Sequence, residues 1–135
     1  LILQQDQPDD YVIASGRRAT VRDFVQMSFA HLGVTVAWEG EGVDEVGIVE
    51  AVDAALLAER VQGQAALTPG QVVVRIDPYY FRPSEVDNLW GDASKAMARL
   101  GWAPRTSLEG IVEEMMAHDL QLARGQMYLK GIDRA

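Results

Sequence analysis

The stretch SGRRATVRDFVQMSFAHLGVTVAW, residues 15–38, restricts the fold of this chain more than any other part of it. Thr20 is a good helix N-cap, and Asp23 can return the hydrogen bond in a capping-box-like exchange. Apolar side chains then recur with helical spacing until Gly33, which is a typical helix stop. Residues 34–38 read as a short strand. With a strand expected at residues 11–14 before it, this stretch predicts a strand that leads into an amphipathic helix and then into a second strand, as in an α/β fold.

Patterns elsewhere predict the elements that pack around this unit. We expect strands at residues 11–14 and 72–76, an extended edge at 43–52, and helices at about 93–100 and from Thr106 or Ser107 to about Arg124, whose inner face would carry Leu108, Ile111, Val112, Met115 and Leu122. Alanine-rich residues 51–70 favour a surface excursion or a short helix. At 135 residues the chain has the length of one domain, 1–135, so we expect a small mixed sheet with packed helices.

Charge and composition narrow the possible partners. The formal net charge of −8 disfavours binding to nucleic acid or to an anionic membrane surface, because the surface repels phosphates. A small anionic ligand would need a local arginine site. The sequence has no cysteine and no apolar stretch of about 18 residues, which suits a cytoplasmic protein and predicts no membrane span.

The stretch DPYYFRPSEVD, residues 77–87, is the clearest candidate site, because it follows a predicted strand directly. Arg82 precedes Pro83, which disfavours helical backbone at the arginine and suits the start of a short turn that contains Glu85. A guanidinium matches phosphate oxygens, and a carboxylate can accept from vicinal hydroxyls. The pair therefore suits a nucleoside diphosphate. The alternative is a structural turn in which Glu85 pairs with Arg82 or caps its own turn.

Other candidates are weaker. Glu114, His118 and Asp119 occupy neighbouring helical positions, but without further ligands they indicate a solvated face, and no metal site is predicted. Arg17 and Arg18 could meet a phosphate, although a basic pair before a helix is more often simply exposed.

Several motifs together resemble the C-terminal part of the GDP-mannose 4,6-dehydratases, a family of extended short-chain dehydrogenases/reductases. The resemblance rests on FRPSEVD within residues 77–87, GDASKA at 91–96, LGWAP at 100–104, AHDL at 117–120 and WEGEGVDEVG at 38–47. Tyr79, Ser84 and Trp90 depart from the usual residues but leave the Arg-Pro-x-Glu frame intact.

This resemblance implies a function for the segment and for its parent protein. Arg82 would bind the diphosphate of GDP and Glu85 the ribose hydroxyls. The parent would convert GDP-mannose to GDP-4-keto-6-deoxymannose and water with NADP, as a homodimer or homotetramer. The chain starts without methionine, so we expect a substrate-binding lobe cut from a longer polypeptide.

The catalytic and cofactor motifs of that family are absent from the sequence. It has no GxGxxG turn, and no tyrosine is followed four residues later by a lysine. We therefore expect no catalytic residue here, NADP bound by the missing N-terminal half, and an isolated segment without activity. Two alternatives stay open: a non-catalytic nucleotide-sugar binding fragment, or a lobe of another nucleotide-sugar dehydratase, epimerase or reductase.

Overall fold

The computed structural model describes residues 1–62, 66–82, 84, 86 and 88–132, with side chains described as far as Gln126. The elements in these residues are two short 3-10 helices, four α-helices and three strands. In chain order they are η1 (Ile2–Gln4), α1 (Val21–His31), β1 (Val34–Glu39), η2 (Gly42–Asp44), β2 (Val46–Val52), α2 (Ala54–Val61), β3 (Val72–Arg75), α3 (Ser94–Leu100) and α4 (Leu108–Ile132).

The strands form one sheet in the order β1-β2-β3. Both pairings are antiparallel, with Val36 opposite Val49 and Gly47 opposite Val74. The α/β class is thus confirmed, but the expected mixed sheet is wrong for the strands described, all of which are antiparallel. Strands β1 and β2 are joined by a short connection that contains η2, whereas the longer connection from β2 to β3 contains α2.

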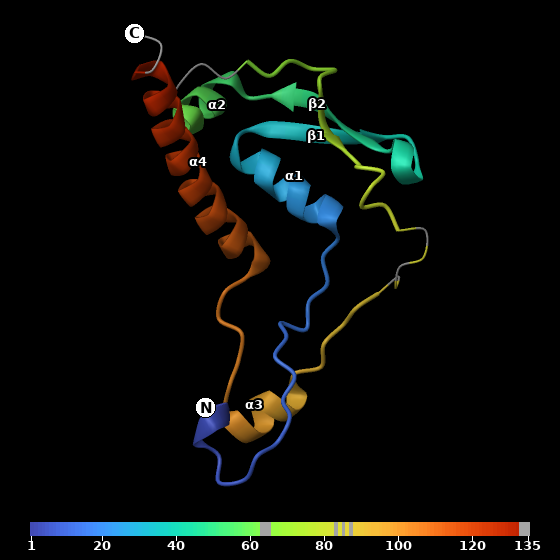
Figure 1. The fold of residues 1–135 in the computed structure, drawn as a ribbon, viewed down its shortest axis with the longest axis vertical. Coiled ribbons are helices and arrows are strands. Elements are labelled where there is room, and N and C mark those ends of the chain that lie inside the picture. Colours follow the sequence, from blue (N-terminus) through green and yellow to red (C-terminus); the bar gives the residue numbers. More distant parts are fainter. Residues whose placement is uncertain (63–65, 83, 85, 87, 133–135) are drawn as a thin grey trace.

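The hydrophobic core lies between the sheet and the helices. Helix α1 packs on β1 and also contacts α4, which in turn contacts α2 (Figure 1). Four side chains are buried at the centre of the hydrophobic core: Val34, Val36, Val49 and Leu57. Alternate residues of β1 point inward, as a half-buried strand requires. No helix in the described part of the chain is long and apolar enough to cross a membrane.

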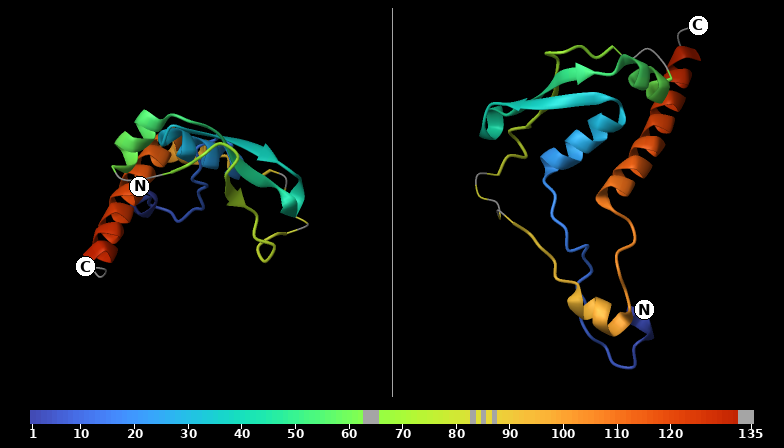
Figure 2. Two further views of the ribbon diagram at one scale, coloured as in Figure 1. Left: turned by 90° about the horizontal axis from the view of Figure 1, so that it is seen from above. Right: turned by 180° about the vertical axis from the view of Figure 1, so that it is seen from behind.

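A second group of elements lies at the far end of the molecule from the sheet. Helix α3 sits there beside the N-terminal segment, in the views from the front and from behind (Figures 1 and 2). Asp9 joins the two: its Oδ1 lies 2.6 Å from Lys95 Nζ and its Oδ2 2.8 Å from Arg99 Nη1. These contacts hold the pKa of Asp9 below its usual 3.8, chiefly through the hydrogen bond from Lys95.

The local signals for α1 are confirmed. The Thr20 hydroxyl accepts from the N–H of Asp23 at 3.0 Å, and Asp23 Oδ2 accepts from the N–H of Thr20 at 2.8 Å. Gly33 ends the helix with a φ of +76°, which favours glycine. Asp53 similarly caps α2, so the short helix, one of the two structures predicted for residues 51–70, is present.

Two predictions were wrong. Residues 11–14 form no strand: Val12 and Ile13 are about half exposed, and the segment runs beside Gly91 without joining the sheet. Helix α4 continues past Arg124, to Ile132. On its predicted inner face Val112 is buried, whereas Ile111, Met115 and Leu122 are 41–53% exposed.

Candidate functional site

The turn after β3 is built by Asp77. Its carbonyl accepts from the N–H of Tyr80 at 3.0 Å, and its Oδ1 accepts from the N–H of Tyr79 at 2.9 Å. Such an Asx-type turn is a common use of aspartate. The two tyrosine rings meet edge to face with centroids 5.0 Å apart, and both are largely exposed. The chain therefore presents an aromatic surface just before Arg82.

The predicted arginine lies on the exposed stretch that follows this turn. Arg82 has an interaction within the chain and is not a free residue. Pro83 and Glu85 lie outside the described residues. The binding of a diphosphate by Arg82 and of a ribose by Glu85 therefore stays a prediction.

Downstream of Arg82, the chain lies against the loop that precedes α1. Arg18 Nη1 donates to Asn88 Oδ1 at 2.7 Å, and Trp90 Nε1 donates to the carbonyl of Gly16 at 3.1 Å. The sequence identified Arg18 only as part of a basic pair and Trp90 only as a departure from the usual residue of the family. Neither contact has a local signal, because about 70 residues separate the partners.

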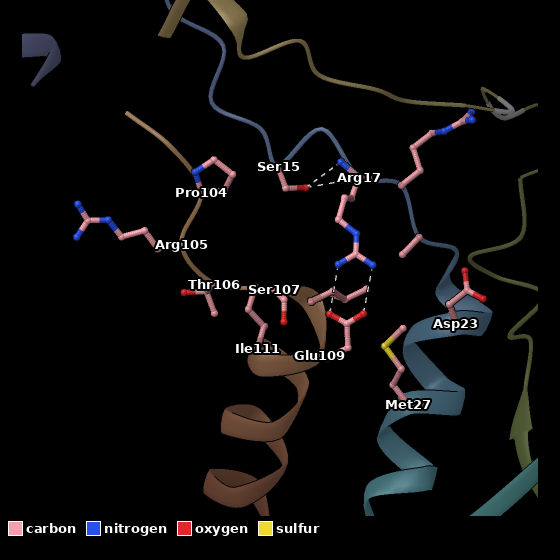
Figure 3. A pocket seen from close by; sticks show the side chains of 13 residues that line it. Ser15, Arg17, Asp23, Met27, Pro104, Arg105, Thr106, Ser107, Glu109 and Ile111 are labelled. Atoms are coloured by element: carbon pink, nitrogen blue, oxygen red, sulfur yellow. Dashed lines mark hydrogen bonds and ion pairs between the residues drawn. The ribbon is translucent and has the colours of Figure 1, made fainter. Parts of the chain in front are cut away.

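A cavity of about 470 Å³ opens between this loop and the first turns of α1 and α4. Figure 3 shows Arg17 reaching across it toward Glu109. The two oxygens of Glu109 lie 3.3 and 3.5 Å from the terminal nitrogens of Arg17. Met27 from α1 and Ile111 from α4 add apolar surface. Arg82 does not line this cavity, which is therefore a separate feature.

The carboxylates in the cavity wall are stabilised in their charged form. The pKa of Glu109 is lowered first by a backbone hydrogen bond and then by the hydroxyl of Ser107 and the charge of Arg17. The pKa of Asp23 is lowered by its hydrogen bonds with Thr20. Both acids therefore carry charge at neutral pH, and Glu109 balances Arg17.

Residues 40–47 lack the geometry of a dinucleotide-binding turn, and the described residues contain no candidate metal cluster. The glycine-rich residues 40–47 form a 3-10 turn between two antiparallel strands, whereas a dinucleotide turn joins a strand to a helix N-terminus. Within the described residues, no group of three or more His, Cys, Asp or Glu side chains could hold a metal ion. Glu114, His118 and Asp119 are exposed on α4.

Comparisons with known proteins agree on one family. The family described as GDP-mannose 4,6 dehydratase matches residues 1–115. A GDP-mannose 4,6-dehydratase of Vibrio cholerae is 47% identical over 96% of this chain and 33% of its own length. The enzyme of the same name from Yersinia enterocolitica is 44% identical over the same shares, and the human GDP-mannose 4,6 dehydratase is 40% identical over 92% of this chain and 29% of its own length.

These matches extend over the whole α/β unit and the Arg82 region. The chain belongs to the GDP-mannose 4,6-dehydratase family. It spans about a third of the length of the curated relatives it matches, 33% of the V. cholerae protein.

Proposed function

We propose that this chain is the GDP-binding part of a GDP-mannose 4,6-dehydratase. Arg82 would hold the diphosphate of GDP-mannose and Glu85 the ribose hydroxyls. The parent enzyme would convert GDP-mannose to GDP-4-keto-6-deoxymannose and water as a dimer or tetramer. NADP would be held outside this chain, which alone would turn over no substrate.

The observation that carries this proposal is the 47% identity to a GDP-mannose 4,6-dehydratase over nearly the entire chain. The exposed position of Arg82 after the Asp77 turn is compatible with contact to a ligand. A guanidinium is suited to phosphate because its planar fork matches two oxygens and its charge is permanent. The exposed Tyr79 and Tyr80 beside it offer flat surfaces to a nucleotide.

Calorimetric titration of the 135-residue chain with GDP, UDP and dTDP tests the assignment. We expect GDP to bind more tightly than the other two. Arg82→Ala should weaken GDP binding by roughly tenfold to a hundredfold, since a hydrogen bond to a charged group contributes about 1.5–3 kcal/mol. Tighter binding of UDP or dTDP would instead support a lobe of another nucleotide-sugar enzyme.

Arg75→Ala is the matched control, because it removes an exposed arginine at the end of β3 while leaving the Asp77 turn unchanged. Circular dichroism checks that both variants keep the helix content of the wild type. An Arg82→Ala chain that binds GDP as tightly as the Arg75→Ala chain would refute the site. An absence of GDP binding to the wild-type chain would refute the role proposed for it.

A further inference from the structure

We propose that the cavity between the first turns of α1 and α4 binds a small hydroxylated oxyanion, a sugar phosphate or a sugar acid. Arg17 would hold the phosphate or carboxylate group, which would take the place of Glu109. The site is distinct from the proposed GDP site, because Arg82 does not line the cavity. Its volume of about 470 Å³ is in the usual range for small-ligand pockets.

Glu109 already shows how an oxyanion would sit in this cavity. Its two carboxylate oxygens face the two terminal nitrogens of Arg17, which is the fork-to-fork geometry that arginine also uses for phosphate. The contacts of 3.3 and 3.5 Å exceed the roughly 2.7–2.9 Å usual for strong charged pairs. The side chains are 69% and 53% exposed, so the pair contributes little and an external anion can displace the carboxylate.

The backbone holds Arg17 in place for this role. Gly16 has a φ of +70°, which allows the tight turn before the arginine. The Ser15 hydroxyl accepts from the N–H of Arg17 at 3.3 Å, and Trp90 donates to the carbonyl of Gly16 at 3.1 Å. Because Ser15 and Trp90 already hold this loop, ligand binding costs little further conformational entropy.

The other walls of the cavity suit a sugar. Met27 and Ile111 give an apolar surface for one face of a ring, and the hydroxyl of Thr106 can exchange hydrogen bonds with ring hydroxyls. Figure 3 shows Arg105 pointing away from Arg17, whereas Arg17 points toward Glu109. Because the chain has a net charge of −8, binding of an anion in this cavity depends on the positive charge of Arg17.

Titration of the 135-residue chain with a hexose 1-phosphate and with a hexuronate tests the proposal, and calorimetry measures the affinity. Arg17→Gln should lower the affinity about tenfold or more, because the charged contact is lost. Glu109→Gln should raise it about two- to fivefold, since the competing carboxylate is gone. The tighter ligand of the two identifies phosphate or carboxylate as the preferred group.

The two variants should change the affinity for the ligand in opposite directions, which distinguishes a binding site from a structural ion pair. Loss of a structural pair would harm both variants alike, so a Glu109→Gln chain that binds no more tightly than wild type would overturn the proposal. Failure of both ligands to bind, or equal binding by Arg17→Gln, would do the same. The exposed control Arg75→Gln should leave this affinity unchanged.

Discussion

Replacing Gly47 by alanine should destabilise the sheet. Gly47 is buried in the central strand β2, opposite Val74 of β3. An added Cβ would lie 2.9 Å from the Cβ of Val74 and 3.1 Å from Cγ1 of Val36. The Val74 atom is attached directly to the backbone, so relief requires β3 to move away from β2.

Overpacking of this kind costs about 1–3 kcal/mol. At this chain length a change of 1 kcal/mol shifts the midpoint of thermal unfolding by roughly 4 °C, so we expect a loss of about 4–12 °C. Far-UV circular dichroism during heating measures the midpoint, and urea unfolding gives the free energy.

Gly110→Ala in α4 is the matched control for the same chemical change. A Cβ there would meet only ordinary contacts, with Thr106 at 3.5 Å and Ser107 at 3.6 Å. Because alanine favours helix over glycine, this variant should gain about 0.5–1 kcal/mol. A Gly47→Ala chain as stable as wild type would refute the steric reasoning for the sheet.

Three further changes test other parts of the fold. Thr20→Ala removes the capping box of α1 and should cost about 1 kcal/mol in urea unfolding; an unchanged midpoint would contradict the cap. Leu57→Ala should cost about 2–5 kcal/mol because Leu57 is 4% exposed, whereas Leu122→Ala, at 53% exposed, should cost far less, and equal costs would argue against the core described. The lowered pKa of Asp9 means that its ionised form stabilises the folded chain above its usual pKa of 3.8 and that this contribution is lost as the pH falls below that value. The thermal midpoint of Asp9→Asn should accordingly fall less than that of wild type between pH 5 and about pH 2, and parallel curves would contradict the pairing with Lys95.

Local signals were sufficient for the elements whose ends are set by neighbouring residues. The capping box of Thr20, the left-handed Gly33 and the β-branched run of β3 all act within a few positions, so their sequence pattern predicts them. Residues 11–14 have an equally good strand pattern. In the structure they lie beside Gly91 and pair with none of the three strands of the sheet, an arrangement that no local pattern reveals.

The candidate site shows the same limit. The sequence placed Arg82 in a loop after a strand, and the structure puts it on an exposed stretch after β3. The bidentate contact of Arg17 with Glu109 joins residues 92 positions apart and had no signal beyond a basic pair. Which of several arginines faces a cavity depends on how distant segments meet.

Asp9 links the N-terminal segment to α3 through ion pairs with Lys95 and Arg99, and these contacts lie far from the buried core beside the sheet. Proteolytic removal of residues before Thr20 would consequently release α3 from Asp9 but leave the three-stranded sheet intact. Amide hydrogen exchange of the intact chain should show two zones of protection, in which the amides of α3 exchange much faster than those of β2.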